Sequence, residues 1–181
     1  MSASAPTVDT AAPAADPRAP RRVRHQPRRR TLTIKQVDRI AAHMIRVTLT
    51  GDLEGFSSLG FDDHIKLFFP DGTLDAAGTA NTLSRDFTPR RHDAAANILE
   101  IDFALHDAGP ATRWAAQAKP GDALNVGGPR GSFIIPTDFD WHLLIGDETG
   151  LPAISRFRWR STLIVSSQIS RRIALLSGKC M

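Results

Sequence analysis

The stretch Arg85-Asp86-Phe87-Thr88-Pro89-Arg90-Arg91 combines guanidinium groups, an aromatic ring and a hydroxyl within seven residues. In an extended strand side chains alternate between two faces, so Arg85 and Phe87 share one side and Thr88 lies on the other. Such a strand suits a flat anionic ligand, because a ring can cover an aromatic face and an arginine can pair with a phosphate. It equally suits an edge strand with solvated arginines and a core phenylalanine. This stretch alone leaves both interpretations open.

Short alternating stretches on either side predict further strands. We expect them over residues 31–37, 43–50, 64–69, 98–105, 122–126 and 132–135. Residues 73–84 are small and polar, which predicts a loop, and residues 92–97 predict a turn. In the stretch 98–105 we expect Glu100 and Asp102 to face water. The sequence therefore predicts a mainly β fold, a six-stranded antiparallel Greek-key barrel.

One helix is predicted within this barrel. Ala111, Trp114, Ala115 and Ala118 form an apolar stripe at helical spacing after Gly109-Pro110. The free amide groups at the start of the helix, with Thr112 in its first turn, can seat a phosphate. A helix that only closes one end of the barrel is the plainer alternative.

The architecture changes after the barrel. Trp141 to Ile145 reads as a short apolar strand, 146–150 as a tight loop and 151–156 as a helix start. Strand, glycine-bounded loop and helix are how a nucleotide-binding α/β domain begins. Without a full glycine fingerprint, this stretch alone identifies no ligand.

Composition narrows the classes of partner. Apolar residues make up 41% of the chain and charged residues 23%, as in soluble globular proteins. The single cysteine, Cys180, allows no disulfide framework and suits a reducing cytosol, so we expect a cytoplasmic protein. No apolar run reaches membrane-spanning length, and no membrane partner is expected. The six histidines are scattered without ligand spacing, so we expect no metal site in the protein itself.

The net charge of +4 is unevenly distributed. Residues 1–30 carry +5, residues 156–181 carry +6, and the middle of the chain carries −7. Residues 1–27 have almost no large apolar side chains, which predicts a disordered basic arm. Because the basic residues lie in such segments and aromatic residues do not interleave with them, we expect no specific nucleic-acid partner.

Several motifs in this order resemble the siderophore-interacting protein family, flavin-dependent ferric-siderophore reductases related to the ferredoxin reductases. The motifs are residues 85–91, Asp102-Phe103-Ala104-Leu105-His106, residues 109–115, Gly128-Pro129-Arg130-Gly131-Ser132-Phe133, residues 138–142 and Gly146-Asp147-Glu148-Thr149. The resemblance covers roughly residues 28–156. It implies an FAD-binding barrel over 28–136 and the start of an NAD(P)H-binding domain over 137–181.

The resemblance also implies roles for individual residues. Arg85 would meet the FAD phosphates, Phe87 would lie against the isoalloxazine, and Thr88 would hydrogen-bond near its reactive nitrogen. The remaining implied contacts, to phosphate, ring or helix N-terminus, come from Arg90, His106, Gly109, Ala111 and Thr112. No catalytic side chain is implied. Electrons would pass from NAD(P)H through FAD to Fe(III) in a siderophore, with the protein as a monomer.

The sequence departs from the family pattern in two places. Phe87 stands where the family usually has tyrosine, which keeps the stacking face and removes a hydroxyl. From Thr149 to Met181 there is no Asp or Glu, so we expect a truncated domain with an incomplete NAD(P)H site and a partly exposed strand at 141–145. The alternative function is a non-enzymatic β-barrel module whose basic arms bind an anionic partner.

Overall fold

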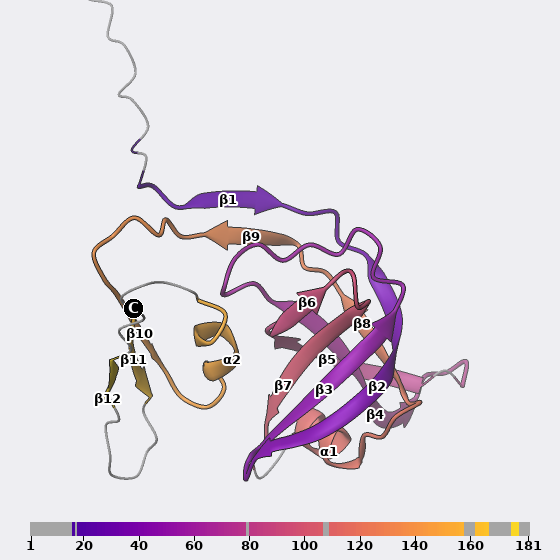
Figure 1. The fold of residues 1–181 in the computed structure, drawn as a ribbon. Helices are drawn as coiled ribbons and strands as arrows, with labels where there is room; N and C mark the ends of the chain where they lie inside the picture. Colours follow the sequence, from indigo (N-terminus) through magenta and orange to yellow (C-terminus); the bar gives the residue numbers. More distant parts are fainter. Residues whose placement is uncertain are drawn as a thin grey trace, which may run out of the picture.

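The computed structural model describes residue 16 and residues 18–78, 80–106, 109–157, 162–166 and 175–177. Its main sheet consists of β2 (Arg29–Ala41), β3 (Met44–Gly51), β4 (Ile65–Leu74), β5 (Ala80–Phe87), β6 (Arg91–Asp93), β7 (Ile98–Ala104) and β8 (Ala123–Gly127). The strand order is β5-β4-β8-β2-β3-β7-β6, and every neighbouring pair is antiparallel. Figure 1 shows these strands coiled into a barrel-like layer. The mainly β, antiparallel fold is confirmed, with seven strands in the sheet instead of the expected six.

Alternating apolar residues of the strands fill the core of this sheet. In β3, Ile45, Val47 and Leu49 are all buried, as the period of two requires. The helix α1 (Pro110–Gln117) lies against the core through Ala115, which is buried, and through Trp114. The predicted apolar stripe of the helix is therefore confirmed. This packing fixes the start of α1 beside the ends of β5 and β7.

The predicted loop at 73–84 and turn at 92–97 are wrong in part. β4 runs on to Leu74 and β5 already begins at Ala80, while β6 occupies the start of the predicted turn. Pro70 is the register partner of Thr82 in this long hairpin. Residues 72–78 at the tip of the hairpin are exposed, so apolar burial does not stabilise this end of it. The small polar side chains of residues 73–84 show no alternation of apolar and polar residues from which strands could be predicted.

A second, two-stranded sheet joins β1 (Arg21–Arg24) to β9 (Gly131–Ile134). The prediction of a disordered arm is therefore wrong for Arg21–Arg24, while residues 1–15 and 17 lie outside the described residues. Ser132 anchors this ribbon: its hydroxyl donates to Asp63 Oδ2 (2.6 Å) and meets His25 Nε2 at 2.7 Å and the amide of Leu59 at 3.0 Å. Polar contacts, which no hydrophobic pattern reveals, hold the strand in place.

The C-terminal part forms a three-stranded sheet of β10 (His142–Gly146), β11 (Thr162–Ser166) and β12 (Leu175–Ser177), with α2 (Leu151–Ile154) after β10. β10 and β11 are parallel, so the strand expected at 141–145 has a neighbouring strand that the sequence did not predict. The β-branched run at 162–165 carried the signal for β11. Cys180 lies outside the described residues.

One side of β10 is exposed, as expected from the sequence. Trp141 just before the strand is 66% exposed, Leu143 45% and Ile145 66%. Alternate residues along the strand point to the same side of a sheet, so these three form one apolar strip. Among the helices in the described part of the chain, none has the length and hydropathy needed to cross a membrane.

Candidate flavin site

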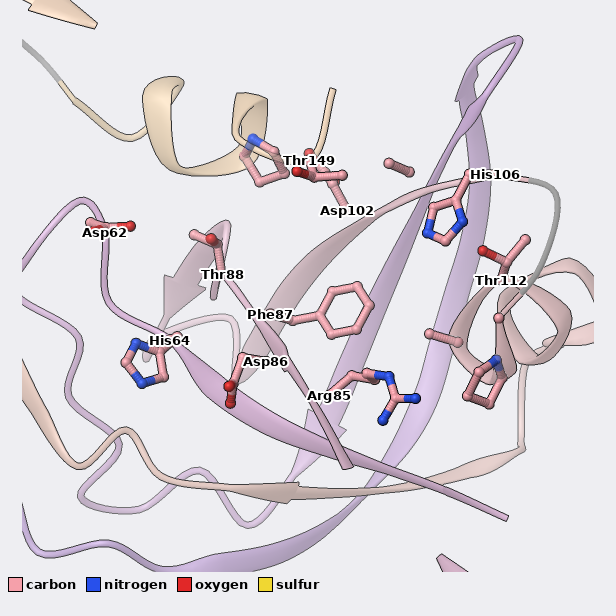
Figure 2. Close-up of a pocket in the computed structure, with 15 residues that line it drawn as sticks. Asp62, His64, Arg85, Asp86, Phe87, Thr88, Asp102, His106, Thr112 and Thr149 are labelled. Atoms are coloured by element: carbon pink, nitrogen blue, oxygen red, sulfur yellow. The ribbon is translucent and has the colours of Figure 1, made fainter. Parts of the chain in front are cut away.

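A cavity of about 540 Å³ opens between the ends of β5 and β7, the start of α1 and the loop that follows β10 (Figure 2). Its volume lies in the ordinary range for small-molecule sites, about 300–1,000 Å³. Its walls are Asp62, His64, Arg85, Asp86, Phe87, Thr88, Asp102, Ala104, His106, Gly109, Pro110, Ala111, Thr112, Thr149 and Pro152.

The structure brings seven of the eight predicted site residues into this cavity. They are Arg85, Phe87, Thr88, His106, Gly109, Ala111 and Thr112. Arg90 does not line the cavity; its Nε lies 3.7 Å from Asp102 Oδ2. The strand β5 ends at Phe87, so the alternation that would have placed Arg90 beside Thr88 stops before it.

Phe87 is partly buried, with its ring against the core on one side. The ring centroid lies 4.6 Å from that of Phe103 and 6.2 Å from that of Phe69. Figure 2 shows the ring projecting from the end of β5 into the middle of the cavity wall. A ring held this way offers a fixed apolar surface to a flat ligand.

Arg85 has no carboxylate partner among the described residues. Its Nη1 donates to the carbonyl of Ser84 at 2.8 Å, and the side chain is otherwise exposed at the cavity. The remaining N–H groups of the guanidinium are therefore available to an anion. Arginine is well suited to phosphate, because its planar fork can make two parallel hydrogen bonds.

The start of α1 adds backbone donors to the same wall. Gly109 caps the helix without a side-chain hydrogen bond, and the first turn holds no acidic residue. The amide of Arg113 is already bonded to the carbonyl of Gly109 at 3.0 Å, whereas those of Ala111 and Thr112 precede the first intrahelical bond. These two amides and the helix dipole favour an anion at this end of the cavity.

Together these groups fit the parts of FAD. The guanidinium of Arg85 and the helix amides provide donors for a diphosphate, and the ring of Phe87 provides a surface for a tricyclic ring. His106 lies at the same end as Thr112 in Figure 2. No acidic side chain pairs with Arg85 or caps α1 in the described residues, so no carboxylate occupies these donors.

Asp102 lines the cavity, and its position was wrongly predicted from the sequence. It was expected to face water, but it is only 8% exposed. Arg46 on β3 clamps it with two hydrogen bonds, Nε to Oδ1 at 2.7 Å and Nη2 to Oδ2 at 2.9 Å. The hydrogen bond and charge of Asp102 raise the pKa of Arg46 above its ordinary value. Alternation predicted the correct face of β7 but not that arginines cover it.

Thr149 and Pro152 enter the wall from the loop and helix after β10. Asp147 holds this loop: its Oδ1 accepts hydrogen bonds from the hydroxyl and the amide of Thr149 at 2.6 and 2.9 Å. These bonds lower the pKa of Asp147, the hydroxyl contributing most. The loop 146–150 was expected to carry ligand groups, but no residue of it was predicted in the flavin site.

A second hollow of about 390 Å³ adjoins the first, and His64 lines both. Its walls are Pro27, Arg28, Arg29, His64, Lys66, Phe68, Gly127, Gly128 and Arg130. Four of these side chains are permanently cationic, and the guanidinium of Arg29 lies 3.9 Å from the ring centroid of Phe68. We refer to this hollow as the basic hollow. Within the described residues, no group of three His, Cys, Asp or Glu side chains is arranged to hold a metal ion.

Comparison with known proteins gives consistent results. Residues 33–133 match the profile of the siderophore-interacting FAD-binding domain. An NADPH-dependent ferric-chelate reductase of Escherichia coli K12 is 43% identical over an alignment 178 positions long, which covers 91% of this chain and 70% of the relative. A ferric vibriobactin reductase of Vibrio cholerae is 35% identical in an alignment that covers 64% of this chain and 48% of that protein. The solved structure of a siderophore utilization protein from T. fusca is similar over 88% of this chain and 69% of that one, with a TM-score of 0.72 and 34% identity.

Proposed function

The chain belongs to the family of siderophore-interacting FAD-binding domains, and from this premise we propose that it binds FAD in the cavity beside Phe87 and reduces siderophore-held Fe(III). The observation that carries the proposal is the convergence of Arg85, the Phe87 ring and the free amides of α1 on one cavity. When bound there, FAD supplies a ring that accepts two electrons from a nicotinamide and passes them to iron.

The protein's own contribution is binding and orientation. Arg85 and the start of α1 hold the diphosphate, Phe87 supports one face of the ring, and Thr88 offers a hydroxyl at its edge. Because the ring of Phe87 is fixed against Phe103, it can orient the ligand at little further entropic cost. Arg90, predicted to assist with phosphate or ring, lies beside Asp102 and makes no flavin contact in this proposal.

The basic hollow is the proposed place of the iron substrate. It shares His64 with the flavin cavity, and two of its four cations suit a chelate that carries negative charge, since Arg28 and Lys66 already pair with Asp52 and Asp86. Hard oxygen ligands favour Fe(III) over Fe(II), so the transfer of one electron to each iron weakens the chelate's hold. Iron would thus arrive as part of its chelate, without a protein metal site.

The first test is flavin binding. Purified protein is expected to take up FAD and turn yellow, and Arg85→Ala should raise the Kd about 10- to 100-fold by removing a charge-assisted phosphate contact. Phe87→Leu, which keeps apolar bulk without the ring, should raise it about tenfold. Arg39→Ala, at an exposed arginine outside the cavity, is the charge-matched control. Unchanged FAD affinity in both site variants, measured by calorimetry, would refute the site.

The second test is electron transfer to iron. Protein loaded with FAD and reduced by dithionite should be reoxidised without oxygen by a ferric tris-catecholate, faster than free reduced FAD is. The rate should fall with added salt and in Arg130→Gln, because the basic hollow attracts an anion.

NADPH should reduce the bound flavin slowly, since the segment after residue 156 departs from the family pattern. A colourless protein with salt-sensitive nucleic-acid binding would instead support the non-enzymatic module.

We also propose the division of the chain at residue 136, a monomeric state and a cytoplasmic location. The bounds of the strands support this division, since β9 ends at Ile134 and the three-stranded sheet begins with β10 at His142. Light scattering of the purified protein checks the monomer, and cell fractionation checks the location.

A further inference from the structure

Asp102 is a buried carboxylate held by two arginines in the wall of the flavin cavity. Arg46 binds both of its oxygens, and Arg90 Nε lies 3.7 Å from Oδ2. This two-point contact is the geometry of an ionised carboxylate with a guanidinium. Arg46 also lies 3.8 Å from Glu100. The flavin contacts proposed above use none of these charges.

The carboxylate lies nearer to the cavity than its counter-charges do. Asp102 lines the cavity, whereas neither Arg46 nor Arg90 does. Figure 2 shows Asp102 on the same side of the cavity as Thr149, across from Arg85. A ligand ring resting on Phe87 would therefore share the cavity with the negative end of this ion pair, with Asp62 and Asp86 as further carboxylates of the wall and Arg85 as its cation.

A fixed negative charge in the cavity changes how readily a bound flavin ring is reduced. Two-electron reduction takes up two electrons and, near neutral pH, one proton, so the ring gains one negative charge. In a partly water-excluded cavity a fixed carboxylate disfavours that charge, and arginines behind it offset part of the effect. Each charge shifts the equilibrium by its own interaction energy with the reduced ring.

We propose that the buried Asp102 carboxylate lowers the flavin's reduction potential in this protein by its field, while Arg46 and Arg90 hold the carboxylate in place and limit the effect. The proposal rests on the proposed function, because it requires FAD in this cavity. A lower potential makes the reduced ring a stronger reductant, which suits Fe(III) stabilised by hard oxygen ligands. The two arginines pair with the buried carboxylate, whose burial would be costly without them.

A purely structural ion pair would behave differently. Arg46 and Asp102 are register partners on β3 and β7, so their contact also joins two central strands. If that were its only role, removal of either partner would weaken folding and leave the potential of the bound flavin unchanged. The electrostatic role predicts shifts of opposite sign from the two halves of one pair.

The experiment measures the two-electron potential of bound FAD against a reference dye in matched variants. Asp102→Asn should raise the potential and Arg46→Gln should lower it, each by at least a tenfold change in the reduction equilibrium constant, which is about 30 mV for two electrons. Arg46→Lys, which keeps the charge, should shift it less than Arg46→Gln. Asp93→Asn is the control, because it removes the same charge from the neighbouring strand β6, where Asp93 pairs with Arg91 outside the cavity.

Shifts in the same direction, or no shift in either variant, would overturn the proposal. If Asp102→Asn does not fold, Arg90→Gln replaces it and should lower the potential, and an unchanged value there is equally decisive against it. Failure of the proposed function itself looks different, because the unaltered protein would then bind no FAD and give no potential to measure.

Discussion

His92 lies in a small stack of rings and charge at the edge of the barrel. Its ring centroid is 4.8 Å from that of Phe56, and the guanidinium of Arg30 lies 5.6 Å from the same Phe56 ring. Burial lowers the pKa of His92, Asp93 raises it, and the positive charge of Arg30 lowers it further. The folded protein therefore holds this histidine neutral at a pH where an exposed histidine is already protonated.

This histidine should make stability depend on pH. Between about pH 6.5 and the lowered pKa of the folded state, the unfolded chain binds a proton at residue 92 that the folded chain does not, so the free energy of unfolding falls as the pH falls through this window. Above this window both states are neutral and the residue contributes no slope. Urea denaturation at pH 7.5 and pH 5.5 should show a smaller loss for His92→Gln than for the unaltered protein.

The same substitution at an exposed histidine, His43→Gln, is the control and should keep the full loss. An identical loss in His92→Gln and in the unaltered protein would show that other groups account for the pH dependence.

Single residues differ in how well the sequence predicted them. Arg85, Phe87 and Thr88 were predicted because they share one short motif whose order resembles a known family. Asp102 and Thr149 were missed as site residues for different reasons. The position of Asp102 depends on arginines from two other segments, and that of Thr149 on how a later loop approaches the barrel, so neither is encoded by neighbours in the sequence.

At the scale of elements, α1 links the core to the cavity. Trp114 lies 5.4 Å from Phe69 and 5.6 Å from Phe103, measured between ring centroids. The same helix presents its first amides to the cavity, so the anchor of Trp114 fixes where those donors lie. Packing of one face of the helix thereby positions the free amide groups at its N-terminal end.

Loss of this anchor should reduce both stability and flavin affinity. Trp114→Ala removes a large, partly buried ring and is expected to lower the free energy of unfolding by about 2–4 kcal/mol. The Kd for FAD should rise in the fraction that remains folded, because the helix amides lose their fixed position. Thermal unfolding and FAD titration of the same preparation measure the two effects.

Gln117→Ala, on the exposed side of the same helix, should change stability by no more than about 0.5 kcal/mol. A folded Trp114→Ala protein that binds FAD as tightly as the unaltered chain would show that α1 does not hold the diphosphate.

Helices and strands could be predicted from the sequence where one side of the element is buried, because burial gives the apolar residues a regular spacing. The alternation of β3 and β7 and the stripe of α1 were found because each buries one side. The ends of the β4–β5 hairpin and the strand β1 were missed, since backbone pairing and the Ser132 contacts stabilise them. Such contacts leave no apolar periodicity to detect.

For the whole molecule, the sequence predicted an antiparallel sheet followed by the start of an α/β unit. It did not predict the parallel strand β11, because the unusual basic composition of the tail outweighed a short β-branched run. Nor could it predict that two hollows share His64, since that depends on how the whole sheet curves.

The cavity wall is built from two regions that are distant along the chain. Arg85 and Phe87 come from the main sheet, while Thr149 and Pro152 come from the region that follows β10. Any molecule that fills the space touches both, so its affinity adds directly to the cohesion between them. The supply of FAD would then determine how long the C-terminal region resists proteases. A shortage of FAD would first lower the amount of intact protein.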